Sequence, residues 1–143
     1  MKKILTLFIS FVLACGTLAV LPSCNNKTAD PVIALITLHG ESSTYDKNFI
    51  DAFKAACKAK GLKEGQYKIQ SNVPEEGEEC YEAAVGFAEE GFKAVFADSF
   101  GHEANMIKAA KANPNVQFGH ATGTKAHTEK LSNYHNAFAS IYE

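Results

Sequence analysis

After the first thirty residues, apolar runs with a strand-like pattern alternate with runs that have a helical period. Val32–Leu38 is a nearly continuous apolar, β-branched run, which is typical of a central strand. The segment 46–60 places its apolar residues on one helical stripe, and Gly61 is suited to end that helix. Residues 67–73 alternate between apolar and polar positions, which predicts a strand nearer the edge of a sheet.

The same alternation continues through the second half of the chain. The polar residues 124–130 predict a loop, and Gly91 and Pro114 are placed to end two of the helices. The expected elements are helices over 75–90 and 103–112, strands over 94–97 and 116–118, and a last helix from Asn133 with Tyr134, Phe138, Ile141 and Tyr142 on one stripe.

Strands that alternate with helices predict an α/β fold with a parallel, Rossmann-like sheet and right-handed crossovers. The simplest arrangement places the second strand beside the first and the third strand on the first strand's other side. The first two helices then cover opposite faces of the sheet, which puts Cys57 and Cys80 too far apart for a disulfide. Both cysteines are predicted to be buried as small apolar residues on their helices.

The N-terminus has the layout of a secretory signal, because two lysines follow Met1 and residues 4–21 are almost wholly apolar. That run ends at Pro22-Ser23-Cys24, which resembles the cleavage site of a bacterial lipoprotein with Cys24 as the lipid-carrying residue. An uncleaved membrane anchor and a soluble secreted form are the alternatives, and the anchor also leaves the domain outside the cytoplasm. The expected boundaries are a signal peptide over 1–24, a tether over 25–31 and a folded domain over 32–143.

Composition narrows the class of protein. At 143 residues with 46% hydrophobic content, the chain supports one domain. Its net charge is −2 and all 14 basic residues are lysine, so it has neither a basic patch nor a guanidinium group for bidentate phosphate contacts. This composition argues against nucleic-acid binding.

Ligands of open α/β sheets bind beyond the carboxyl ends of the strands, so the turns that follow the predicted strands form the candidate site. Asp98-Ser99-Phe100-Gly101 offers a carboxylate, a hydroxyl, an aromatic ring and a flexible glycine directly after the third strand. Phe100 and Tyr45 are the aromatic residues least accounted for by the apolar stripes of the predicted core. Two aromatic rings at one edge of the sheet suit a planar ligand such as a nucleobase. The hydroxyls of residues 42–44 favour helix capping.

Catalytic and metal-binding patterns are weak. The chain has no Walker loop, no paired-glycine dinucleotide fingerprint after the first strand and no Gly-x-Ser-x-Gly elbow. The carboxylates of residues 75–79 favour a solvated helix start, where the helix dipole stabilises anions. Metal binding is an open alternative with no compact ligand spacing; its candidate ligands are His39, His102, His120, Glu41 and Asp98.

Several segments of the second half resemble the basic membrane protein (BMP) family, the extracytoplasmic substrate-binding lipoproteins of ABC importers. The similar segments are Ala94–His102, Ile107–Lys111, Pro114–Phe118, His120–Gly123 and Asn133–Glu143.

The resemblance extends over residues 32–143 and implies part of the N-terminal lobe of a type 1 periplasmic-binding-protein fold. It implies a purine nucleoside or related solute as ligand, no cofactor and no catalytic activity. It also implies an ABC permease and ATPase as partners, and a lipid anchor on the extracytoplasmic face of the cell membrane.

The family's ligand residues carry over at the turns that follow three of the strands. Family members stack an aromatic ring on the base and use carboxylates on the ribose, which implies Phe100 or Tyr45 for the first role and Asp98 for the second. The implied ligand-binding residues are Ser42, Ser43, Tyr45, Asn48, Asp98, Ser99, Phe100, Gly101, His120 and Thr122.

Family members are much longer than this chain, so we expect an N-terminal fragment that encodes one wall of a two-walled cleft. Two other hypotheses remain open. One is a self-contained flavodoxin-like enzyme or metal-binding domain, and the other is a truncated product without function.

Overall fold

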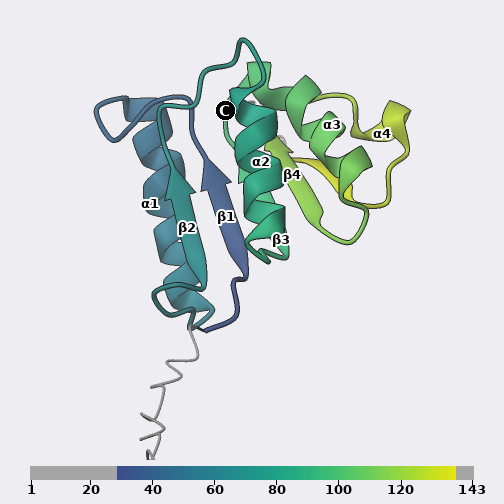
Figure 1. Ribbon diagram of the computed structural model, residues 1–143. Coiled ribbons are helices and arrows are strands. Elements are labelled where there is room, and N and C mark those ends of the chain that lie inside the picture. Colours follow the sequence, from purple (N-terminus) through teal and green to yellow (C-terminus); the bar gives the residue numbers. More distant parts are fainter. Residues whose placement is uncertain (1–28, 138–143) are drawn as a thin grey trace, which may run out of the picture.

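The computed structural model describes residues 29–137 of the chain (Figure 1). The predicted signal peptide, Cys24 and the segment 138–143 lie outside these residues. The strands are β1 (Ile33–Ile36), β2 (Tyr67–Gln70), β3 (Ala94–Ala97), β4 (Gln117–Ala121) and β5 (Tyr134–Ala137). The helices are α1 (Thr44–Ala59), α2 (Glu79–Glu89), α3 (Glu103–Ala112), which follows a 3-10 turn at Phe100–His102, and the short α4 (Ala126–Glu129).

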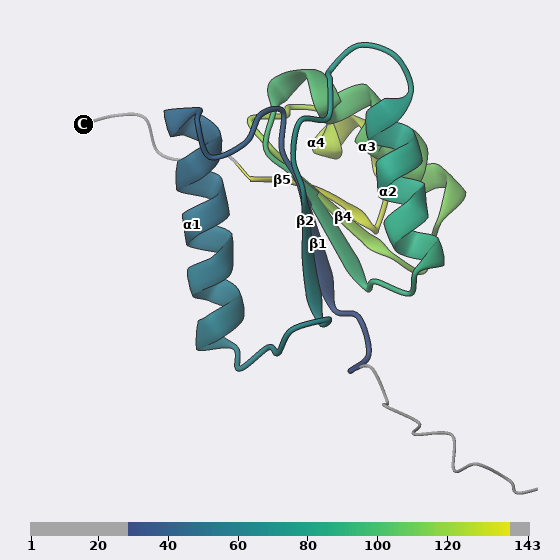
Figure 2. The same ribbon diagram turned by 60° about the vertical axis from the view of Figure 1, so that its left-hand side comes forward.

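The five strands form one parallel sheet in the order β2-β1-β3-β4-β5. The predicted placement of the second and third strands on either side of the first is therefore confirmed. Figure 2 shows α1 on one face of the sheet and α2 and α3 on the other. Because every strand runs in the same direction, all the carboxyl ends meet at one end of the sheet, which we call the carboxyl edge.

The core lies between the sheet and α2 and α3. Ala34, Val95 and Phe118 point from neighbouring strands into this layer, where they meet Phe87 of α2 and Met106 of α3. Each of these side chains is almost fully buried. Removing a Val, Phe or Met side chain from water stabilises the fold by roughly 1.5–3 kcal/mol, which offsets part of the entropy cost of ordering the chain.

The opposite face of the sheet is covered by α1 through aromatic contacts. Phe49 of α1 stacks on Phe96 of β3 with ring centroids 6.4 Å apart, and Phe53 meets the Tyr67 ring at 6.1 Å. The helical stripe read from the sequence is thus the face of α1 that packs on the sheet.

The two cysteines of the folded region are free and buried, as predicted. Cys57 lies on α1 and Cys80 on α2, so the sheet separates them. Burial raises the pKa of the Cys80 thiol to about 12, which keeps it in the unreactive protonated form.

The predicted helix from Asn133 is wrong over the described residues, because Tyr134–Ala137 is strand β5. The side-chain NH2 of Asn133 donates to the backbone carbonyl oxygens of Ala110, Asn113 and Val116 at 2.9–3.1 Å. The backbone carbonyl of Asn133 accepts from the Phe118 backbone amide. These bonds hold the chain against the open edge of β4, where it continues the sheet. Part of the predicted loop 124–130 also differs, since it contains α4.

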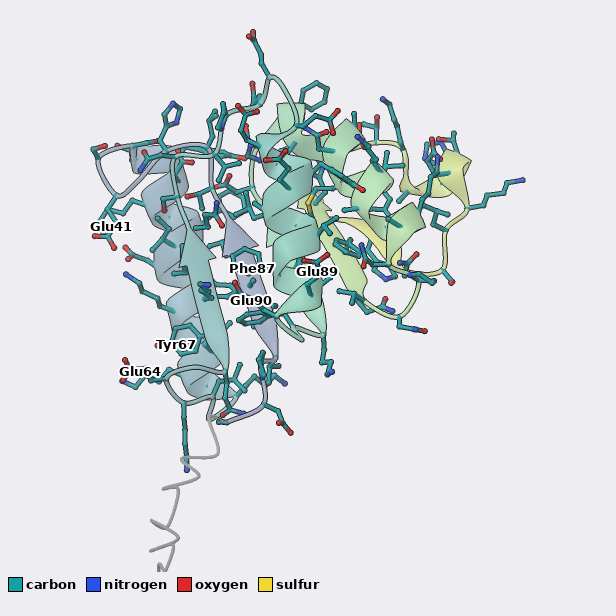
Figure 3. All side chains as sticks on the ribbon, viewed as in Figure 1. Glu41, Glu64, Tyr67, Phe87, Glu89 and Glu90 are labelled. Atoms are coloured by element: carbon teal, nitrogen blue, oxygen red, sulfur yellow. The ribbon has the colours of Figure 1, made fainter. Side chains whose placement is uncertain are left out.

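In Figure 3, Glu41 lies beside α1, and Glu64 lies at the lower end of the domain, near the start of β2. Glu90 lies beside β2, where it pairs with Lys68. Within residues 29–137, no helix combines the length and the apolar character needed to cross a bilayer.

Candidate functional site

The loop after β1 is organised by a buried carboxylate, Asp46, in the first turn of α1. Ser43 is the N-cap residue, and its hydroxyl oxygen accepts from the Asp46 backbone amide at 3.3 Å, which confirms the predicted capping role. The Asp46 carboxylate accepts in return from the Ser43 hydroxyl and, at 2.8 Å, from the His39 backbone amide. Burial alone would raise the pKa of Asp46, but these hydrogen bonds outweigh it and hold the pKa below its ordinary value.

This arrangement does not form a nucleophile system. The Ser43 hydroxyl and the His39 ring both bond to the Asp46 carboxylate, with the His39 Nδ1 at 3.3 Å. A Ser-His-Asp relay needs the histidine between the other two groups, so that it removes the serine proton. Asp46 occupies that middle position here, and a carboxylate held ionised by its donors is a weak base.

Asp98 follows β3 and is fully buried. Its Oδ1 accepts from the Leu38 backbone amide at 3.2 Å, whereas its Oδ2 has no hydrogen-bond partner. Burial and the nearby negative charge of Asp46 raise the pKa of Asp98 to about 7. The edge therefore holds two carboxyl groups in different states: Asp46 is ionised, and Asp98 is protonated below a pH of about 7.

Tyr45 joins the first two predicted turns, because its hydroxyl donates to the Asp98 backbone carbonyl at 3.0 Å. Its side chain remains 48% exposed, and that of Phe100 is 64% exposed. These are the exposed large hydrophobic side chains among the described residues. The sequence left the same two rings unassigned to any core stripe, and the structure places both at the carboxyl edge.

Glu75 binds the turn after β3, although the sequence predicted it at the start of a helix. The Ser99 hydroxyl and the Gly101 backbone amide both donate to Oε1 of Glu75, the second at 2.9 Å. A Cβ atom at position 101 would lie 2.5 Å from the Glu75 carboxyl carbon, so any larger residue there would displace the Glu75 side chain. The bond from Ser99, followed by that from Gly101, holds the pKa of Glu75 below its ordinary value.

Glu75 was predicted to lie at a helix start, and that prediction is wrong. The helix α2 begins four residues later, at Glu79. Pro74 and Gly77, which has a φ of 82°, keep the intervening segment in a loop that reaches the turn after β3. In the sequence, this loop is indicated by Gly77, which interrupts the run of acidic residues.

Strand β4 ends with a buried histidine, and the turn after it begins with a strained threonine. His120 is fully buried, and its Nε2 lies 2.6 Å from the Ser99 carbonyl oxygen. A carbonyl only accepts, so Nε2 carries the proton and Nδ1, which has no partner, is the bare nitrogen. Thr122 has a φ of 61°, a left-handed conformation that a β-branched residue rarely adopts.

The remaining predicted positions differ in their exposure. Ser42 and Asn48 are exposed at the start of α1. His102 is buried, with Nε2 2.9 Å from the Val73 carbonyl oxygen. In the described part of the chain, no group of three or more His, Cys, Asp or Glu residues is placed to hold a metal ion.

Comparison with known proteins supports the fold and does not identify a family. No family model matches the chain, and no curated protein matches it. An ABC transporter system solute-binding protein from Conexibacter woesei DSM 14684 is similar in structure, with a TM-score of 0.62 at 17% identity, over 76% of this chain and 35% of that one. A structure described as a "putative lipoprotein from Peptoclostridium difficile 630 (fragment)" gives a TM-score of 0.62 at 13% identity, over 76% of this chain and 84% of that one.

At these identities the likeness concerns the fold alone. The chain has an α/β fold with a five-stranded parallel sheet, like that of a periplasmic-binding-protein lobe. It spans about a third of the length of the solute-binding protein, since the match covers 35% of that chain.

Proposed function

We propose that this chain is part of an extracytoplasmic solute-binding protein of an ABC importer, similar to the BMP family, and that its carboxyl edge binds a purine nucleoside or a related solute. In this proposal the region 32–143 belongs to the N-terminal lobe of a two-lobed protein. It binds a solute for delivery to a permease and ATPase and performs no chemistry. Cys24 carries a lipid that holds the protein at the extracytoplasmic face of the membrane.

The observation that carries the proposal is the pair of exposed rings, Tyr45 and Phe100, beside carboxyl groups at one sheet edge. An aromatic side chain exposed to water loses apolar surface when a planar base stacks on it, and any nucleobase offers such a face. Hydroxyl groups of a sugar suit the nearby carboxylates, which accept hydrogen bonds. The fold that the chain shares with a solute-binding protein supports the same conclusion.

We assign the wall of this site to the residues at the turns after β1, β3 and β4. Asp46 and Glu75 hold the turns after β1 and β3 through hydrogen bonds to His39 and Gly101, and His120 lies within hydrogen-bond distance of the Ser99 carbonyl. The proposed ligand-binding residues are Ser42, Ser43, Tyr45, Asn48, Asp98, Ser99, Phe100, Gly101, His120 and Thr122.

A binding experiment on the purified chain tests this proposal. Titration with inosine, adenosine, ribose and glucose, followed in ¹H–¹⁵N spectra, detects binding even in the millimolar range. We expect the nucleosides to shift the backbone signals of Phe100 and Gly101, and Phe100→Ala to weaken binding by about tenfold, since base stacking contributes roughly 1–3 kcal/mol. The control is Phe53→Leu, which changes an aromatic residue of α1 that packs against Tyr67 of β2. The proposal is contradicted if only the sugars shift these signals, or if none of the four solutes does.

A further inference from the structure

We propose that a groove between α1 and the amino end of the sheet, where the strands begin, binds a long-chain carboxylic acid. Its acyl chain lies on the apolar lining of the groove and its carboxylate lies beside Lys60 and Lys93. The volume of the groove is about 650 Å³, and sites for small molecules occupy roughly 300–1,000 Å³. The groove is at the opposite end of the sheet from the carboxyl edge, so this inference goes beyond the proposed function and does not depend on it.

The floor of the groove is formed by the first residues of three neighbouring strands. Ala94 of β3 pairs with Ile33 of β1 on one side and with Gln117 of β4 on the other. A parallel sheet is normally covered by helices on both faces. Ile33 and Ala94 are nevertheless only partly buried, and Gln117 is exposed. The floor therefore has apolar surface that α1, the helix on this face in Figure 2, leaves open.

The wall of the groove is the second half of α1. From Phe53 to Lys60 the helix axis rises by about 10 Å, which gives a chain room to lie along the helix. Each methylene group that leaves water on such a surface contributes roughly 0.8 kcal/mol to binding. Apart from Lys60, Lys93 and Gln117, the lining residues are apolar: Val32, Ile33, Phe53, Ala56, Cys57, Leu62 and Ala94.

The charge of the groove selects the headgroup. Lys60 directly follows α1 and Lys93 directly precedes β3, so both ammonium-bearing residues lie at the amino end of the sheet. Both are exposed, and neither forms an ion pair with another residue of the described part of the chain. None of the lining residues is acidic. An anionic headgroup therefore finds two unpaired cations here, whereas a cationic one is repelled.

The groove is also close to a source of such molecules. Val32 lines the groove and directly follows the predicted tether 25–31. The chain from Cys24 to Val32 reaches at most about 28 Å when extended, so the proposed lipid anchor keeps this end of the domain near the bilayer. Fatty acids concentrate in bilayers through the hydrophobic effect. A single groove suits their one chain, whereas a phospholipid would leave its second chain in water.

The test titrates the full chain with dodecanoate, hexanoate and dodecyltrimethylammonium, each below its micelle-forming concentration, and follows ¹H–¹⁵N spectra. We expect dodecanoate to shift the backbone signals of Ile33 and Ala94, while those of Phe100 and Gly101 stay in place. Dodecanoate should bind at least tenfold more tightly than hexanoate, which has half its chain length. It should exceed the cation by a similar factor, because the lysines repel a positive headgroup.

Two pairs of variants locate the site. Ala56 is exposed and lines the groove, so Ala56→Trp fills it and should weaken dodecanoate binding at least tenfold. Ala55→Trp, at the preceding exposed position outside the lining, is the matched control and should leave the affinity unchanged. Lys60→Glu should weaken binding by roughly tenfold, since an attraction becomes a repulsion. Its control is Lys58→Glu, at an exposed position of the same helix end outside the lining.

The proposal is overturned if dodecanoate leaves the signals of Ile33 and Ala94 unshifted, or if the cation binds as tightly. Equal losses for Ala56→Trp and Ala55→Trp also overturn it. The apolar residues 4–21 are common to all variants, so binding to them cancels in each comparison. Shifts of the groove signals on raising the protein concentration alone would assign the groove to a second copy of the chain. Should Ala56→Trp not fold, the two lysine variants decide.

Discussion

Replacing Asp98 by asparagine should change the pH dependence of stability more than any other single substitution at the carboxyl edge. Asp98 is fully buried, it faces the carboxylate of Asp46, and one of its oxygens has no partner. These surroundings disfavour its ionised form in the folded protein. The unfolded chain has no such constraint, so the carboxyl group binds its proton more tightly when the protein is folded.

The magnitude follows from the pKa of Asp98, which rises from 3.8 to about 7 on folding. The folded state holds more protons between these values, so the free energy of unfolding falls as pH rises, by up to about 1.4 kcal/mol per unit. The contribution is fully present below pH 3.8 and is lost once the pH exceeds about 7. The total is on the order of 4 kcal/mol, a large part of the stability of a small domain.

Two buried histidines act in the opposite direction. Burial lowers the pKa of His102 and of His120 below the ordinary value of 6.5, so their contribution to stability is lost as the pH falls below that value. The pH dependence of the unfolding free energy of the wild type alone therefore does not give the contribution of Asp98. The difference between the wild type and Asp98→Asn does, because the histidines are common to both.

The measurement is urea unfolding followed by circular dichroism at half-unit steps from pH 5 to 8. The asparagine is neutral throughout, so the unfolding free energy of the variant relative to the wild type should rise by about 2–3 kcal/mol between pH 5 and 7 and then level off. Asp51→Asn, an exposed aspartate of α1, is the control for removing one negative charge, and its curve should run parallel to the wild type. Parallel curves for Asp98→Asn as well would refute the raised pKa of this buried carboxyl group.

Three further predictions concern other parts of the chain. Cys24→Ala should abolish incorporation of labelled palmitate in cells, and labelling that persists in this variant would exclude Cys24 as the lipid-carrying residue. Thr122→Gly should stabilise the protein by about 1 kcal/mol in urea unfolding, because relief of the left-handed strain exceeds the entropy that glycine loses; a loss of stability would show that the threonine contacts outweigh the strain. Phe118→Ala should lower the unfolding free energy by about 3–5 kcal/mol, whereas Phe100→Ala should change it by less than about 0.5 kcal/mol, because the first ring is buried and the second largely exposed. Equal effects of the two substitutions would contradict the assignment of Phe118 to the core and of Phe100 to the surface.

The sequence anticipated the fold where the patterns were local. The apolar run after Pro31 and the stripes of α1 and α3 each arise from contacts along one element, and their periods are read directly from the residues. The order of β1, β2 and β3 followed from right-handed crossovers, and with it the separation of Cys57 and Cys80. The two exposed rings, Tyr45 and Phe100, were also found, because they stood outside every core stripe.

The predictions from sequence were wrong where the structure of a segment depends on contacts with residues that are distant in the chain. Tyr134–Ala137 carries no clear strand period, and it is a strand because β4 offers an open edge and Asn133 binds three carbonyl groups that come from α3 and its following loop. Glu75 belongs by composition to an acidic helix start, and only the folded chain brings it to the donors of the turn after β3. The pairing of Asp98 with Asp46 likewise joins residues that are far apart in sequence.

The stretch Asp98-Ser99-Phe100-Gly101 shows the same division. Its residue types alone indicated a polar turn with one ring, placed where a parallel sheet binds its ligands. Tertiary contacts decide which of these groups face outward. The Asp98 carboxyl group is buried, Ser99 and Gly101 donate hydrogen bonds to Glu75, and the Phe100 ring remains exposed. Sequence fixes which chemical groups are present and the periods that bury them locally, whereas long-range hydrogen bonds and burial determine which of those groups remain free for a solute.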